Sequence, residues 1–137
     1  MNRTDLQELT EVRLRESRQL LDAGFPDGAY YLAGYAIECA LKACIAKRTL
    51  EHDFPDKKLV NDSHTHDIGK LLQVAELKVE FEAAIQTNPQ LQASLDAIRD
   101  WSEASRYEKK SAQEARDLQQ AIEDQAGGLL PWIRLHW

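Results

Sequence analysis

Residues 29–46 read Ala29-Tyr30-Tyr31-Leu32-Ala33-Gly34-Tyr35-Ala36-Ile37-Glu38-Cys39-Ala40-Leu41-Lys42-Ala43-Cys44-Ile45-Ala46, and nearly all of them are apolar. A helix that is apolar nearly all round must be covered by other elements, because a surface helix has a polar face opposite its apolar stripe. The two charged exceptions are Glu38 and Lys42, whose i,i+4 spacing places them side by side. We therefore expect a central core helix with one polar edge.

The same stretch invites comparison with a membrane-spanning helix. The charged pair lies at its centre, and Asp27, Lys47 and Arg48 flank it. These charges leave no run of about 20 uncharged apolar residues, which a spanning helix needs. We expect a protein that does not enter the membrane.

The composition is typical of a soluble globular protein, with 43% hydrophobic and 29% charged residues. A length of 137 residues suits one domain, spanning 1–137. The first residues form no apolar leader, so Cys39 and Cys44 are expected to be reduced thiols in the cytoplasm, too far apart around their helix to bridge each other. The net charge of −6 argues against nucleic-acid binding through the whole surface, so any RNA contact requires a local patch.

Apolar residues recur at helical spacing in several further segments. Thr4 is the predicted cap of a first helix that stops at Gly24, and Asp27 is the predicted cap of the core helix. The remaining predictions are a loop over 51–63, a helix capped by Thr65 and ending near Leu77, a helix over 78–87 whose pattern also fits a strand, a helix from Asn88-Pro89 to about Trp101, and a helix opened by Ser111 that bends at Gly127-Gly128 and resumes to Ile133. These segments predict an all-α, up-and-down bundle of five to six helices.

Arg106 and Tyr107 form the first candidate site. They lie between two predicted helices, where a guanidinium and a phenol are suited to binding a phosphate or stacking on a base. The alternative is that Arg106 is an ordinary surface charge or caps the carboxyl end of the preceding helix.

Two further groups of residues are candidates for a functional site. His52, His64, His66 and Asp67 offer metal-ligating side chains, but their spacing matches no tetrahedral site and loop histidines are often merely solvated, so we expect no metal. For Glu38 and Lys42 the sequence leaves three interpretations open: the pair faces a pocket, a dimer interface or solvent. The sequence holds no phosphate-binding glycine loop, nucleophile elbow or zinc motif, and we expect no cofactor.

Four blocks of sequence follow one another along most of the chain: Gly28-Ala29-Tyr30-Tyr31-Leu32-Ala33-Gly34-Tyr35-Ala36-Ile37-Glu38-Cys39-Ala40-Leu41-Lys42-Ala43, Thr65-His66-Asp67-Ile68-Gly69-Lys70-Leu71-Leu72, Trp101-Ser102-Glu103-Ala104-Ser105-Arg106-Tyr107 and Leu130-Pro131-Trp132-Ile133. As an ordered set they resemble the HEPN domain family. The resemblance implies a compact helical bundle, commonly a homodimer, found in bacterial toxin–antitoxin and defence systems and often encoded beside a minimal nucleotidyltransferase.

The resemblance also implies a test for catalysis. Many HEPN members are metal-independent ribonucleases, in which an Arg followed after four to six residues by His lines a cleft between two subunits. Arg106 matches the arginine, but the three positions where the histidine falls are Ser111, Ala112 and Gln113. Neither serine nor glutamine can replace an imidazole as a base near neutral pH.

The sequence therefore predicts a cytoplasmic, homodimeric HEPN-like module that recognises phosphate without cleaving a bond. The expected binding residues are Arg106, Tyr107, His66, Lys42 and Glu38, and the expected ligand or partner is a nucleotide, RNA or another protein. One alternative is a ribonuclease toxin in which His66 acts as the base with Arg106. A second alternative is a structural subunit of a nucleotidyltransferase complex.

Overall fold

The computed structural model describes residues 1–49, 53–54 and 56–137, and every regular element within these ranges is a helix. The elements are α1 (Arg3–Asp22), α2 (Pro26–Arg48), α3 (Lys57–Ser63), α4 (Ile68–Val74), α5 (Lys78–Thr87), α6 (Gln90–Arg99), the 3₁₀ helix η1 (Glu103–Tyr107), α7 (Ala112–Glu123) and α8 (Leu129–Ile133). The all-α prediction is confirmed. The predicted count of five to six helices is too low, because the described residues form eight α-helices and η1.

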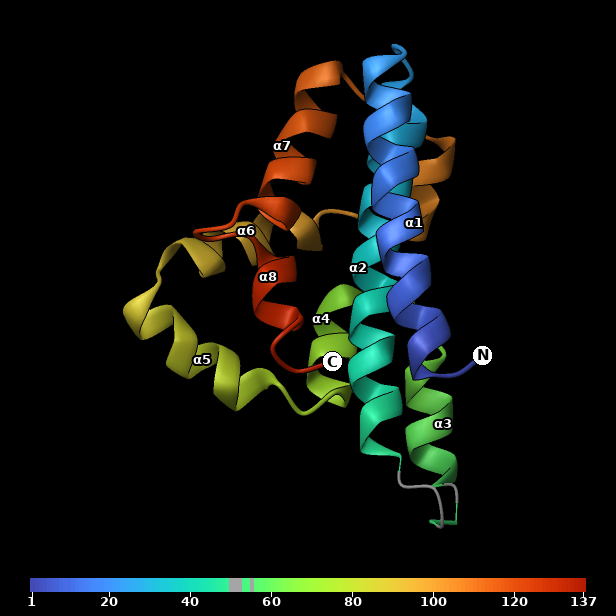
Figure 1. Cartoon of the computed structure of the whole chain (residues 1–137), viewed down its shortest axis with the longest axis vertical. Coiled ribbons are helices and arrows are strands. Elements are labelled where there is room, and N and C mark those ends of the chain that lie inside the picture. The colour runs from blue at the N-terminus through green and yellow to red at the C-terminus, as the bar shows by residue number, and fades with distance from the viewer. Residues whose placement is uncertain (50–52, 55) are drawn as a thin grey trace.

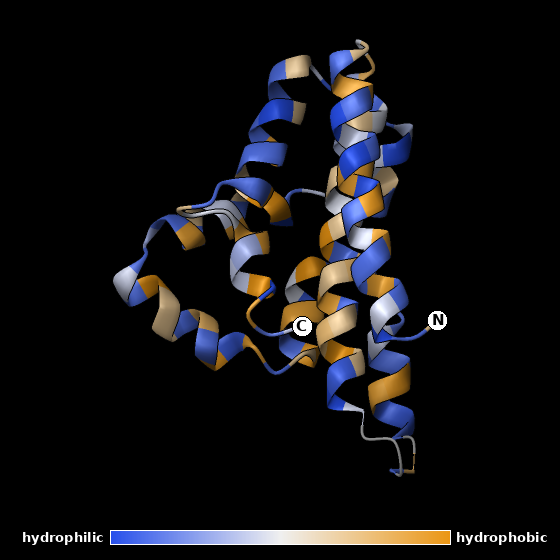
Figure 2. Cartoon of the chain, viewed as in Figure 1, coloured by the Kyte–Doolittle hydropathy of each residue, from blue (hydrophilic) through white to orange (hydrophobic). Residues whose placement is uncertain are grey.

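Helix α2 lies at the centre of this arrangement, in contact with α1, α4, α7, α8 and η1 (Figure 1). Thirteen of its 23 residues are buried. Its small side chains let the neighbouring helices approach closely, as packing of ridges into grooves requires. Figure 2 shows hydrophobic residues where α2, α4 and α8 approach one another, and mainly hydrophilic residues on α7. The prediction of an enclosed core helix is confirmed.

The link between α1 and α2 makes them an antiparallel pair. Gly24 has φ +86, in the left-handed region that glycine adopts without strain, and Pro26 occupies the first turn of α2. Inside the pair, the Ser17 hydroxyl donates a hydrogen bond of 2.6 Å to the Ala29 carbonyl. Both residues are buried, so this contact satisfies polar atoms that water does not reach.

Several predicted helix starts were displaced by a few residues. Asn2, not Thr4, caps α1, in a reciprocal pair of hydrogen bonds with Asp5. Asp27 lies in the first turn of α2, where its carboxylate accepts a hydrogen bond of 2.6 Å from the backbone N–H of Lys110. Asp67, not Thr65, caps α4, which ends at Val74.

The predicted loop over 51–63 is wrong in its second half, because Lys57–Ser63 forms α3. Leu50, Glu51, His52 and Pro55 lie outside the described residues. The Asp56 carboxylate caps α3 by accepting from the backbone N–H of Lys58 at 2.9 Å, and Lys58 pairs with Asp62 at 2.6 Å along the helix. None of its residues is buried, so it has no apolar stripe by which sequence periodicity could reveal it.

The segment 78–87 is helical as predicted, and Ser111 caps α7 by accepting from the backbone N–H of Glu114 at 3.0 Å. The final helix is interrupted rather than bent, because α7 ends at Glu123 and α8 begins at Leu129. At the interruption the buried Ser94 hydroxyl donates to the Gly127 carbonyl at 2.7 Å. The described helices include none with the length and apolar content that crossing a membrane requires.

Candidate functional site

The side chain of Glu38 lies in the interior of the protein, only 2% exposed, on the polar edge of α2. Its carboxylate oxygen Oε1 accepts from Lys42 Nζ at 2.8 Å, one helical turn further on. A buried carboxylate is costly unless cations or hydrogen-bond donors compensate it. The pairing predicted from the i,i+4 spacing is therefore present, although it supplies only part of that compensation.

His66 supplies the rest. Its ring nitrogen Nδ1 lies 3.0 Å from both carboxylate oxygens of Glu38, and Nε2 lies 3.0 Å from Oε2 of Glu103. An imidazole donates from both nitrogens at once only when it carries both protons, whereas the neutral ring satisfies one of the two carboxylates. His66 thus connects the buried core helix to the surface helix η1.

Local hydrogen bonds position His66 just before α4. The Thr65 hydroxyl accepts from the backbone N–H of Asp67 at 3.2 Å, and the Asp67 carboxylate accepts from that of Lys70 at 2.8 Å. These two contacts shape the turn that carries His66. Asp67 and Thr65 therefore serve the geometry of the chain rather than a metal site.

Trp101 anchors the segment that carries Glu103. Its indole is buried, stacks on Tyr31 with ring centroids 6.1 Å apart, and donates from Nε1 to the Tyr31 carbonyl at 3.2 Å. The buried Ser105 accepts from the backbone N–H of Ser102 at 3.3 Å. The start of η1 is thus fixed against α2 by side chains that water does not reach.

An open groove runs between the start of α4 and the link from α6 to η1. Its volume is about 1020 Å³, just above the range of about 300 to 1,000 Å³ found for small-molecule sites. The charged and imidazole side chains that line it are His64, His66, Lys70, Arg99, Asp67 and Glu103. Four of the six can carry positive charge, although the whole chain has a net charge of −6.

Arg106 and Tyr107 lie outside this groove, at the end of η1. Both are exposed, Tyr107 to 81%, and the Arg106 guanidinium carbon lies 5.0 Å from the centre of the Tyr107 ring. Among the described residues, none forms an ion pair with Arg106. In a 3₁₀ helix, side chains three residues apart lie on the same side, so Arg106 follows Glu103 by one turn on that side.

The structure thus brings together three of the five predicted binding residues, namely Glu38, Lys42 and His66. The other two lie outside the groove at the end of η1, where Arg106 is one turn after Glu103 and Tyr107 follows it. Glu103 and Arg99 were missed as site residues. The only signal for Glu103 was its place within the block Trp101–Tyr107, and nothing in the sequence marked it as the partner of a histidine 37 positions earlier.

Metal binding and thiol chemistry find no support at the described positions. No cluster of three or more His, Cys, Asp or Glu side chains within them is arranged to hold a metal ion, and His52 lies outside the described part of the chain. Burial raises the pKa of Cys39 and of Cys44 to about 11. Both thiols are therefore protonated near neutral pH, which makes them poor nucleophiles.

Residues 6–134 match the family model of the HEPN domain. The chain belongs to the HEPN domain family. Comparison with curated proteins gives no match, and neither does comparison with solved structures. In this HEPN domain the positions where the family's catalytic histidine falls open helix α7, with Ser111 as its cap and Gln113 donating to Asp117 at 2.7 Å.

Proposed function

We propose that this HEPN domain binds a phosphate-bearing ligand, a nucleotide or RNA, through Arg106 and Tyr107 and does not cleave it. The observation that supports the proposal is the exposure of Arg106 beside the exposed ring of Tyr107, with no acidic partner among the described residues. A guanidinium makes charge-assisted, bidentate hydrogen bonds to a phosphate, and a phenol ring offers a face on which a base can stack.

The surroundings of His66 support binding without cleavage. Replacing the missing motif histidine requires an imidazole nitrogen that can take a proton from the ribose hydroxyl. Both nitrogens of His66 instead face carboxylate oxygens at 3.0 Å, one of them in the buried core. The residues at 111–113 offer no titratable replacement.

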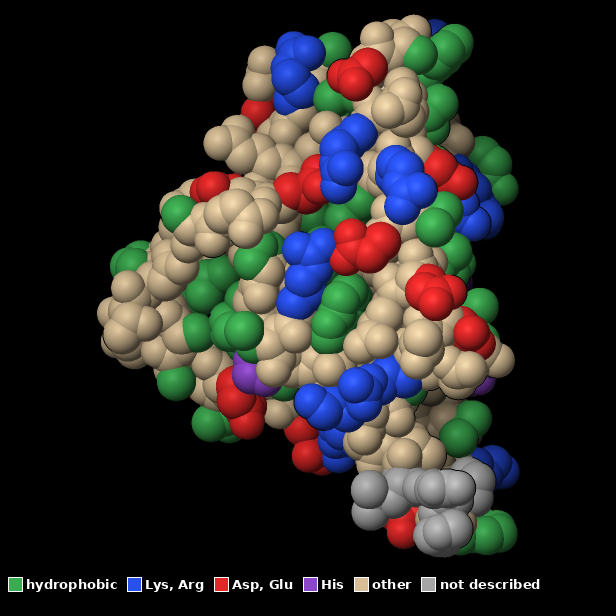
Figure 3. Space-filling model, in the orientation of Figure 1, with side chains coloured by type: hydrophobic (Ala, Val, Ile, Leu, Met, Phe, Trp, Pro, Cys, Tyr) green, Lys and Arg blue, Asp and Glu red, His purple; other side chains and the backbone are tan. Residues whose placement is uncertain are grey.

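The biological setting is part of the same proposal. Family membership and the sequence blocks favour a cytoplasmic homodimer in a bacterial toxin–antitoxin or defence system, with a minimal nucleotidyltransferase as its partner protein. Figure 3 shows basic and acidic side chains interspersed on the face that carries α1 and α7. This face therefore does not offer the broad basic surface of a general RNA-binding protein, and the net charge of −6 favours a local phosphate contact.

The proposal is tested by titrating the protein with a fluorescent adenine nucleotide and with a short oligoribonucleotide. We expect Arg106→Ala to weaken binding of at least one probe by about tenfold, which is the scale of one charge-assisted hydrogen bond. Arg116→Ala is the matched control, because Arg116 is an exposed arginine on α7. Equal affinity of the wild-type and Arg106→Ala proteins would refute the assigned site.

The ribonuclease alternative is a separate outcome of the same preparation. RNA is incubated with the protein in the presence of a chelator, and the ends of the products are analysed. Fragments with cyclic-phosphate ends that disappear with Arg106→Ala and with His66→Ala would establish a metal-independent nuclease and overturn binding without cleavage.

A further inference from the structure

Glu103 fills a position in the groove that an anion is suited to occupy. Its carboxylate lies 3.0 Å from Nε2 of His66, and both side chains are 48% exposed, so the contact lies at the groove surface. On the other side of the imidazole, Nδ1 is held by the buried Glu38. The ring is therefore fixed in orientation and presents Nε2 to the groove whatever anion occupies that position.

Arg99 lies across the start of α4 from the same groove. A Cβ placed on Gly69 would come within 3.2 Å of Arg99 Nε and 3.3 Å of Nη2, so the guanidinium lies close over this glycine. No ion pair joins Arg99 to any residue in the described ranges. Oδ1 of Asp67 would lie 3.3 Å from the same Cβ, so this carboxylate is near the guanidinium without forming an ion pair with it. An exposed guanidinium at the edge of a groove, without an ion-pair partner, is suited to a phosphate.

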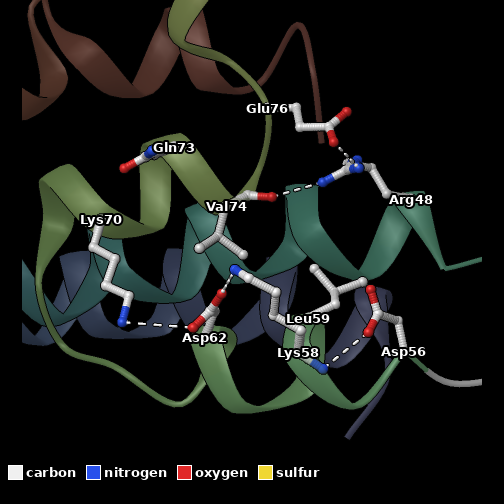
Figure 4. Close-up of a pocket in the computed structure, with 9 residues that line it drawn as sticks. All are labelled: Arg48, Asp56, Lys58, Leu59, Asp62, Lys70, Gln73, Val74 and Glu76. Atoms are coloured by element: carbon white, nitrogen blue, oxygen red, sulfur yellow. Dashed lines mark hydrogen bonds and ion pairs between the residues drawn. The ribbon is translucent and has the colours of Figure 1, made fainter.

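Lys70 is the lysine of the groove lining, and its own carboxylate partner is distant. Its Nζ lies 3.7 Å from Asp62, whereas Lys58 approaches the same carboxylate to 2.6 Å. Figure 4 shows both lysines directed toward Asp62 from α4 and α3. Because Asp62 already has the closer partner, and because the Lys70 side chain is half exposed, turning Lys70 toward an anion in the groove disrupts little.

Of the two carboxylates in the groove, Asp67 is needed to cap a helix, whereas Glu103 is not. Asp67 caps α4 through the backbone N–H of Lys70. Among the described residues, the Glu103 side chain forms an ion pair with His66 alone, and the start of η1 is held independently by Trp101 and Ser105. The Glu103 side chain can therefore rotate away from His66 without unfolding η1.

We infer that the groove is a phosphate-binding site in which the Glu103 carboxylate is a built-in competitor, occupying His66 until a ligand phosphate displaces it. The chemical class of the ligand rests on the proposed function, whereas the site and its regulation rest on His66, Arg99 and Glu103. Glu103 and Arg106 lie on one side of η1, one turn apart. A ligand phosphate that replaces Glu103 is thus next to the residue that contacts the rest of the ligand.

The inference is tested by calorimetric titration of the full chain with pyrophosphate at low ionic strength. Glu103→Gln keeps the shape of the side chain but removes its charge. We expect it to bind pyrophosphate about fivefold more tightly than the wild type, because a neutral amide competes less well for His66 than a carboxylate does. In the Glu103→Gln background, Arg99→Ala should cancel this gain. Glu8→Gln removes the same charge from an exposed position on α1 and should leave the affinity unchanged.

The outcomes separate this inference from the proposed function. Equal affinities of the wild-type and Glu103→Gln proteins for pyrophosphate would overturn the proposal of a phosphate site in the groove. Equal gains in affinity from Glu103→Gln and Glu8→Gln would overturn it as well. If Arg106→Ala weakens nucleotide or RNA binding in that case, the proposed function stands without it. A different outcome is that Glu103→Gln tightens pyrophosphate binding in an Arg99-dependent way, while Arg106→Ala leaves the affinity for nucleotide and RNA unchanged. In that case the phosphate site in the groove is supported and the assignment of Arg106 is wrong. Repeating the titration of the Glu103→Gln protein with the adenine nucleotide and with the oligoribonucleotide identifies the source of the phosphate.

Discussion

The indole ring of Trp101 lies directly on Gly34, so closely that a Cβ at position 34 would come within 2.3 Å of three ring atoms. Glycine is unfavourable in the interior of a helix, yet here its lack of a side chain lets the link before η1 pack against α2. The indole in turn donates to the Tyr31 carbonyl. The position of Glu103 beside His66 therefore depends on the absence of a side chain on α2.

We predict that Gly34→Ala destabilises the protein despite the better helix propensity of alanine. The added methyl group must displace a buried ring, and overpacking of this kind costs about 1 to 3 kcal/mol. Gly28→Ala is the control, because its Cβ would meet only the flexible end of Leu20, at 3.2 Å. Urea unfolding followed by circular dichroism measures both. A Gly34→Ala protein as stable as Gly28→Ala would show that the ring moves freely.

We predict that His66→Ala lowers the free energy of unfolding, because it leaves the buried Glu38 carboxylate with Lys42 as its remaining partner. The expected loss is about 1 to 3 kcal/mol, the cost of an incompletely satisfied buried polar group. In a Glu38→Gln background the charge is gone, so His66→Ala should cost less. A double-mutant cycle measured by urea unfolding gives the coupling between the two residues. Additive effects of the two substitutions would contradict the contact.

We predict that the two thiols resist alkylation in the native protein. Burial raises the pKa of Cys39 and Cys44 to about 11 from an ordinary value of 9.0. At pH 8 a thiol reagent should therefore react slowly with the folded chain and rapidly in urea. The stabilisation from keeping the thiols protonated is complete below pH 9 and is lost as the pH rises toward 11. Fast labelling of the native protein at pH 8 would contradict the burial of both residues.

The alkaline loss of stability has its own control. Tyrosine and lysine side chains also titrate between pH 9 and 11, so the slope of the wild type alone is not diagnostic. In the Cys39→Ala and Cys44→Ala variants one thiol is absent, and the free energy of unfolding should fall less steeply with pH over this interval. Identical slopes would assign the alkaline instability to other groups.

The parts of the fold that follow local rules could be predicted from the sequence. The apolar residues around Ile37 can all be buried only if their helix is enclosed by other elements. The spacing of Ser111 and Glu114 marked the start of α7. Helix α3 escaped prediction because none of its residues is buried, although Leu59 packs partly against the core, so its sequence carries no apolar stripe. Periodicity detects burial, so a helix without buried residues gives no such signal.

The candidate site was predicted in its chemistry but not in its connections. The i,i+4 pair of Glu38 and Lys42 could be read from helix geometry, because that contact lies within one element. The contacts of His66 join three segments that are distant in the chain, and only the packing of Trp101 against α2 brings Glu103 within reach. No spacing rule encodes such a contact, and Arg106 was accordingly expected to share one site with His66, whereas it lies outside the groove, one turn after Glu103.

The antiparallel pairing of α1 and α2 also has a consequence for biosynthesis. The residues in contact are close together in the sequence, so this hairpin can form early as the nascent chain leaves the ribosome. The flank of α2 where Cys44 meets Ile133 has no cover until α8 is made, much later in translation. During that interval the growing polypeptide exposes apolar surface that is buried in the folded protein, and slow translation of the downstream region prolongs its exposure to aggregation.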